Sequence, residues 1–92
     1  MEDFKKSNKS LLQKQLDLTL DFIILIGLEK EISNYDIIPD SGIVLNFKDI
    51  PSLTTFLVCF EIMIKSNSIN IIIINPNMKE LYVEIKLKNI CY

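Results

Sequence analysis

An amphipathic helical pattern between two short apolar runs is the feature that most constrains how this chain can fold. Residues 43–47 form the first run and residues 69–74 the second. Between them, Asp49-Ile50-Pro51-Ser52 is typical of a helix start, with Pro in the first turn and Asp or Ser available as a cap. Apolar residues then recur at three- and four-residue spacing over 52–65, at Leu53, Phe56, Leu57, Phe60, Met63 and Ile64. The pattern predicts a right-handed βαβ crossover (strand 43–47, helix 52–65, strand 69–74) whose strands are covered on both sides.

The N-terminal third of the chain fits two structures. Residues 1–10 are polar and charged, and we expect a flexible arm there. From Leu16 to Leu28 the even-numbered positions are apolar, and the first of them alternate with Asp17, Thr19 and Asp21. This period of two predicts a strand over 16–28, because the Asp/Thr/Asp alternation is hard to place on one helical face. The alternative is a helix capped near Ser10 that runs through Leu12, Leu16, Leu20 and Ile23.

The remaining segments are turns or are ambiguous. Residues 33–42 are rich in turn formers, and Pro39 limits any short helix there. The sequence Asn75-Pro76-Asn77 is expected to end the second apolar run. Residues 78–88 fit a helical stripe through Met78, Leu81, Tyr82 and Ile85, or a strand with alternating Leu81, Val83, Ile85 and Leu87. Together these patterns predict one α/β domain over residues 1–92, with a small mixed sheet and a single layer of helix on it.

Composition excludes some classes of function. The chain has 92 residues, 49% of them hydrophobic, which fills one core and leaves apolar surface that favours an oligomer or a complex. Ala, Arg, His and Trp are absent while Ile, Asn and Lys abound, which is typical of an AT-rich genome. The net charge is −2 and the lysines are scattered, so we expect no nucleic-acid binding. The longest apolar run, Phe22 to Ile26, is too short to span a membrane.

The residue types that enzymes use most often are missing. Without His there is no base near neutrality for a Ser-His-Asp or Cys-His site, and two separated glycines cannot form a phosphate-binding loop. Cys59 has no activating neighbour, and Cys59 and Cys91 form no CxxC pair or zinc motif. We therefore expect no catalytic residues, no metal and no cofactor. The cysteine usage also favours a reducing, cytoplasmic location.

One face of the helix at 52–65 carries apolar residues where solvent is expected. At 100° per residue, the stripe that contains Phe56 and Phe60 faces the core. The opposite side carries Thr55, Val58 and Ile62 as well as polar residues. A surface helix should be polar there, so either the N-terminal segment or a partner covers this side. We predict Thr55, Val58 and Ile62 as partner-binding residues.

Residues 43–90 resemble a STAS domain, the fold of anti-sigma-factor antagonists and of regulatory modules on anion transporters. The matching features are Ile43-Val44-Leu45-Asn46-Phe47 as an apolar strand, Ile50 to Val58 as a loop entering a helix, and Ile71-Ile72-Ile73-Ile74-Asn75-Pro76 as a strand ending in a turn. The resemblance implies a final helix from Lys79 to Ile90. It also places Thr55 where antagonists carry the Ser or Thr that a kinase phosphorylates, although the Asp-Ser-Ser-Gly signature is otherwise absent.

These observations lead to one main hypothesis and one alternative. The main hypothesis is a non-enzymatic, STAS-like regulatory or adaptor domain that docks a protein partner through the outer face of helix 52–65. The alternative is a small structural or inhibitory subunit of a larger phage, organelle or mobile-element assembly, which associates through an edge strand or with itself. An exposed edge strand in the final segment would favour the alternative.

Overall fold

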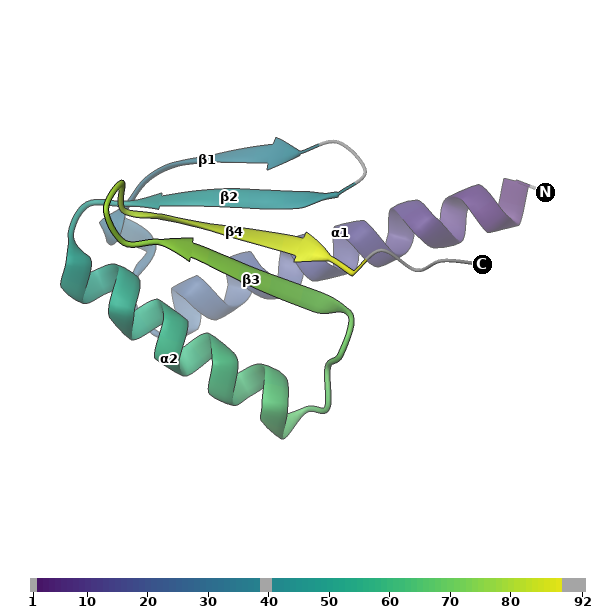
Figure 1. The fold of residues 1–92 in the computed structure, drawn as a ribbon. Helices are drawn as coiled ribbons and strands as arrows, with labels where there is room; N and C mark the ends of the chain where they lie inside the picture. The colour runs from purple at the N-terminus through teal and green to yellow at the C-terminus, as the bar shows by residue number, and fades with distance from the viewer. Residues whose placement is uncertain (1, 39–40, 89–92) are drawn as a thin grey trace.

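The described part of the chain folds into two α-helices and four strands. The computed structural model describes the backbone of residues 2–38 and 41–88 and the side chains from Gln13 onward. The elements are α1 (Glu2–Leu25), β1 (Ile32–Ile38), β2 (Gly42–Phe47), α2 (Ile50–Ser66), β3 (Ile72–Asn77) and β4 (Tyr82–Leu87). A short 3-10 helix, η1 (Glu29–Glu31), precedes β1. Figure 1 shows both helices on the same side of the sheet, which confirms the predicted small α/β fold with one layer of helix on a sheet.

The sheet is antiparallel throughout, and not mixed as the sequence predicted, with strand order β1-β2-β4-β3. Since β2 and β3 both run antiparallel to β4, they are parallel to each other, as a βαβ unit requires. They are not neighbours, however, because β4 lies between them. The predicted crossover is therefore present as a split unit. A short turn at 78–81 folds β4 back against β3, and this local pairing fills the space that α2 leaves between β2 and β3.

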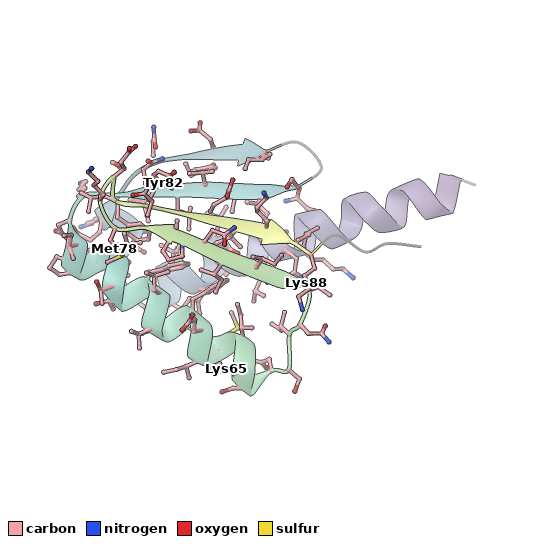
Figure 2. The ribbon with its side chains drawn as sticks, in the orientation of Figure 1. Lys65, Met78, Tyr82 and Lys88 are labelled. Atoms are coloured by element: carbon pink, nitrogen blue, oxygen red, sulfur yellow. The ribbon has the colours of Figure 1, made fainter. Side chains whose placement is uncertain are left out.

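An aromatic cluster joins both helices to the sheet. Phe22 of α1, Phe47 of β2, and Phe56 and Phe60 of α2 lie with neighbouring ring centroids 4.9–6.4 Å apart. Phe56 and Phe60 are fully buried, and the side chains in Figure 2 fill the layer between the helices and the sheet. Such rings contribute both buried area and favourable ring geometry, so this cluster is the centre of the single core.

Helix α1 replaces the strand that the sequence favoured over 16–28, so that prediction was wrong. The residues that face the sheet are Leu16, Thr19, Leu20 and Ile23, a helical stripe with Thr19 and Ile23 buried. The Thr19 hydroxyl donates to the Gln15 carbonyl at 2.8 Å, so this polar residue is buried with its hydrogen bond satisfied. Helix α1 begins at Glu2, within the segment 1–10 that was expected to form a flexible arm.

Gly27 ends α1 in a Schellman motif. The Leu28 amide donates to the Ile23 carbonyl and the Gly27 amide to the Ile24 carbonyl, while Gly27 has a φ of +77°. Leu28 and Ile23 both belong to the hydrophobic core, as the motif requires. The bend at Gly27 turns the chain from α1 through η1 into β1.

The strands differ from expectation in three places. Residues 32–38 form β1 within a segment expected to be turns, and Asn75-Pro76-Asn77 lies inside β3 instead of ending a strand. β3 is an edge strand, where Pro is tolerated because one side needs no hydrogen bonds, so it is not the covered central strand predicted. Residues 82–87 form β4 where the STAS resemblance implied a helix, because burial of Val83 and Ile85 in the core selects the strand alternation.

The outer face of the sheet is mainly polar. Asn34, Asn46, Tyr82 and Asn77 lie in register across all four strands. The Asn46 amide donates to the Asn34 side-chain oxygen at 2.7 Å, and the Asn77 amide donates to the Tyr82 hydroxyl at 3.3 Å.

Within the described residues, no helix is both long and apolar enough to cross a bilayer.

Candidate functional site

The predicted partner-binding residues lie on the exposed side of α2. Val58 and Ile62 are 53% and 60% exposed, and Thr55 is also exposed. Val58 and Ile62 are four residues apart, so their side chains are neighbours one helical turn apart. The N-terminal segment was one of the two expected covers for this face. In the structure α1 packs instead against the opposite side of α2, through contacts of Phe22 with Phe56 and Phe60.

The local sequence fixes the start of α2 and hence the direction of this face. Asp49 is the N-cap, and its carboxylate accepts the Ser52 amide at 2.9 Å. The hydrogen bonds from Ser52 to this carboxylate, helped by the charge of Lys48, hold the pKa of Asp49 below its ordinary value. Pro51 lies in the first turn, as the sequence predicted. Because the helix begins at Ile50, Thr55 belongs to the second turn.

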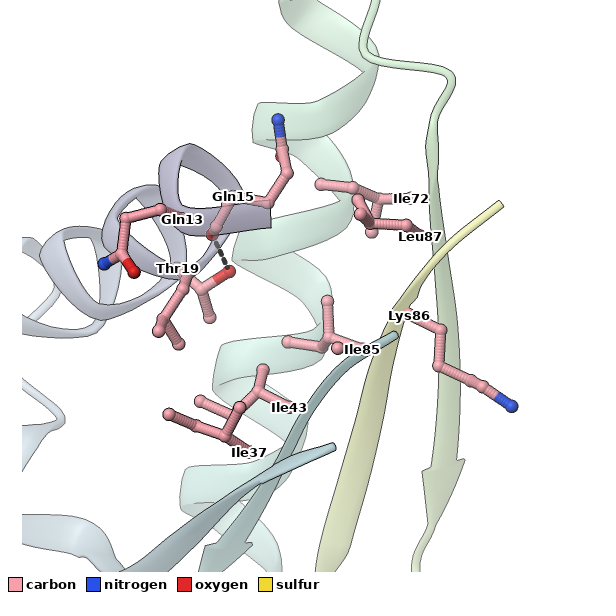
Figure 3. A pocket seen from close by; sticks show the side chains of 11 residues that line it. Gln13, Gln15, Thr19, Ile37, Ile43, Ile72, Ile85, Lys86 and Leu87 are labelled. Atoms are coloured by element: carbon pink, nitrogen blue, oxygen red, sulfur yellow. Dashed lines mark hydrogen bonds between the residues drawn. The ribbon is translucent and has the colours of Figure 1, made fainter. Parts of the chain in front are cut away.

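A cleft that the sequence did not predict opens between α1 and the sheet. Its volume is about 290 Å³. Its walls come from α1 and all four strands: Gln13, Gln15, Leu16, Thr19, Ile37, Gly42, Ile43, Ile72, Ile85, Lys86 and Leu87. In Figure 3 the isoleucine side chains of the sheet face Thr19 and the glutamines of α1, while the Lys86 side chain points away. A cleft built from five separate segments leaves no local signal in a sequence.

The cleft offers apolar surface and few polar groups. The Oε1 atom of Gln15 is buried without a hydrogen-bond partner in the described part of the chain, and the Thr19 hydroxyl already donates to the helix backbone. Among the described residues, the lining contains no carboxylate and no thiol. The cleft therefore has the character of a gap in the packing between helix and sheet, and its geometry points to no reaction.

Other candidate groups are dispersed. No three acidic or cysteine side chains come together as a potential metal site in the part of the chain that the structure describes. Cys59 is a free, half-buried thiol on α2, and Cys91 lies outside the described residues.

A second exposed apolar pair lies at the end of α1. Ile24 is 59% exposed and Leu25 is 79% exposed. The run from Phe22 to Ile26 could have predicted this exposed pair, because five consecutive apolar residues cannot all face one side of a helix. The strand interpretation of residues 16–28 concealed it.

The comparisons with known proteins give no relatives. No protein-family model, no curated protein and no solved structure matches the chain.

Proposed function

We propose that the chain is a non-enzymatic, protein-binding regulatory or adaptor domain that docks its partner on the outer face of α2. The observation that carries the proposal is the exposure of Val58 and Ile62, at 53% and 60%, on neighbouring turns of a helix whose opposite side packs into the core through buried residues such as Phe56 and Phe60. A helix that only covers a sheet gains nothing from apolar residues on its solvent side. A partner that buries both side chains would gain about 2 kcal/mol or more from the transfer out of water.

The test compares three substitutions on the same helix. Val58→Asp and Ile62→Asp place a charge on the proposed face, and Ile50→Asp places one at another exposed apolar position, 52% exposed, at the first residue of α2 and about two turns before Val58. We expect a partner recovered from the source cells with the wild-type chain to be lost with the first two variants and retained with Ile50→Asp. All three variants should unfold at nearly the wild-type temperature, since exposed substitutions change stability by only about 0.5 kcal/mol.

Two results would contradict the proposal. If Val58→Asp and Ile62→Asp both unfold the protein, the face belongs to the core. If they retain every partner that the wild type binds, the face is not a docking surface.

The STAS resemblance adds a regulatory element to the proposal, with Thr55 as a phosphorylation site. A phosphate would add about −1.5 to −2 charge next to Val58 and Ile62, and its desolvation would oppose burial of the face. Thr55→Glu should therefore weaken partner capture while Thr55→Gln, which has a similar size and no charge, should not. Equal capture by both variants would argue against a charge switch.

A further inference from the structure

The two edges of the sheet are not equivalent. One edge strand, β3, contains Pro76, which lacks an N–H group, and β-sheet proteins use such residues to prevent pairing with other chains. The other, β1, contains neither Pro nor Lys, and its residues 33–37 are all exposed. Within the described strands β1 pairs only with β2, and its pairing is regular from Asn34 to Ile38 after an irregularity between Ile32 and Asn34, so in that regular part every second backbone N–H and C=O on the free side is available to another strand.

The side chains of β1 are divided between the two faces of the sheet. Tyr35 and Ile37 are opposite Leu45 and Ile43, which are buried under the helices, so all four share that face. Tyr35 is nevertheless 49% exposed and Ile37 is 53% exposed. The helices thus leave the apolar side of the edge strand uncovered, next to a free backbone edge.

We propose that β1 pairs antiparallel with β1 of a second copy of this chain, with the two-fold axis passing through Tyr35. In this register Asp36 is opposite Asn34 of the second copy, so no like charges meet. An axis through Asp36 would place the two Asp36 carboxylates directly opposite each other, which is unfavourable. The axis through Tyr35 brings the two tyrosines together on the helix side, with Ile37 of each copy diagonal to them, and buries the exposed apolar side chains of the edge.

The difference between the edges also determines the size of the assembly. Because β3 carries Pro76 and β1 is the open edge, pairing through β1 uses the open edge of both copies. The product is a closed two-fold dimer with one continuous sheet, and it does not extend into a fibre.

A charge-swap experiment at position 35 tests both the interface and its axis. Sedimentation equilibrium of the wild type, from micromolar to submillimolar concentration, should show a monomer–dimer equilibrium. Tyr35→Lys and Tyr35→Glu should each weaken dimerisation about tenfold or more, because each places like charges opposite each other and removes an apolar contact. An equimolar mixture of the two variants should recover dimers, since only in this register do the two substituted residues meet.

Matched controls separate this interface from the other surfaces. Ile73→Lys changes a partly exposed isoleucine on the other edge strand, and Val58→Asp changes the proposed partner-binding face, so neither should alter the dimerisation constant. Circular dichroism and thermal unfolding confirm that each variant is folded.

A monomer at every concentration, or a wild-type dimer that is insensitive to both changes at Tyr35, would overturn the proposal. Failure of the mixture to recover dimers would overturn the two-fold axis through Tyr35, and a dimer lost with Val58→Asp would assign the interface to α2. None of these results depends on the identity of the α2 partner.

Discussion

Gly42 is the residue at which the backbone leaves no room for a side chain. A Cβ atom built there would overlap the Ile85 carbonyl oxygen and lie 2.8 Å from the Lys86 Cα. Since both neighbours are backbone atoms of β4, Gly42→Ala should force the strands apart and lower the free energy of unfolding by about 3 kcal/mol. Gly27→Ala is the comparison: it has open space but a φ of +77°, so its cost should be about 1 kcal/mol. Urea unfolding of both variants measures the difference, and equal losses would contradict the close approach of β2 and β4 at Gly42.

Ser68 occupies a conformation that favours glycine. Its φ is +55°, and it lies in a Schellman motif at the end of α2, with the Ile69 amide donating to the Ile64 carbonyl at 2.9 Å. Ser68→Gly should therefore raise the free energy of unfolding by about 0.5–1 kcal/mol. Ser66→Gly, two residues earlier and still helical, should lower it by a similar amount. Chemical denaturation of both variants checks these opposite signs; a loss of stability in Ser68→Gly would contradict the account of the motif.

The cap of α2 makes stability depend on pH in the acid range. The pKa of Asp49 lies below its ordinary value of 3.8 in the folded chain because its carboxylate accepts hydrogen bonds from Ser52. The stabilisation is therefore complete above the ordinary pKa and is lost as the pH falls toward the lower folded pKa. Asp49→Asn keeps a capping oxygen but does not titrate, so its unfolding temperature should fall less between neutral pH and about pH 3 than that of the wild type. Asp21→Asn removes an exposed carboxylate away from the cap, and the same benefit in this control would contradict the assignment to Asp49.

The register of α1 distinguishes the observed helix from the strand that the sequence favoured. In the helix, Ile23 is 3% exposed and its neighbour Ile24 is 59% exposed. In the strand interpretation, Ile24 shares the apolar face with Phe22 and Ile26, and Ile23 points the other way. Ile23→Asp should lower the free energy of unfolding by about 3 kcal/mol or more, whereas Ile24→Asp should change it by about 0.5 kcal/mol. The reverse order in denaturant unfolding would support the strand.

Elements were predictable where a local pattern coincided with burial. The segments α2 and β2 follow from the spacing of Phe56 and Phe60 and from the run at 43–47, since these apolar positions are the buried ones. The helix α1 was not predicted because Thr19 was interpreted as a polar residue that faces solvent, whereas its hydroxyl is buried and bonded within the helix. β1 was missed because an edge strand needs few apolar residues. The exposed face with Val58 and Ile62 followed from helical spacing alone, whereas the cleft is nonlocal and had no signal.

In the whole molecule, β4 is the strand that connects the β1–β2 hairpin to β3. β4 forms ladders with β2 on one side and with β3 on the other, and it contributes Val83 and Ile85 to the core. Without β4, β2 and β3 have no shared hydrogen bonds, and the sheet divides into the β1–β2 hairpin and an isolated β3. A two-stranded hairpin is marginally stable by itself, so local pairing cannot replace the missing strand.

A chain that ends at residue 80 should therefore fail to fold cooperatively, even though it retains both helices and three of the four strands. We expect a thermal scan followed by circular dichroism to show no sigmoidal transition, because the core loses Val83 and Ile85 together with every ladder that joins β3 to the sheet. A chain that ends at Lys88 is the control and should unfold cooperatively, since it keeps all of β4. A sharp transition in the shorter chain would show that α1, α2 and the β1–β2 hairpin form an independent core, and the central place of β4 would then be wrong.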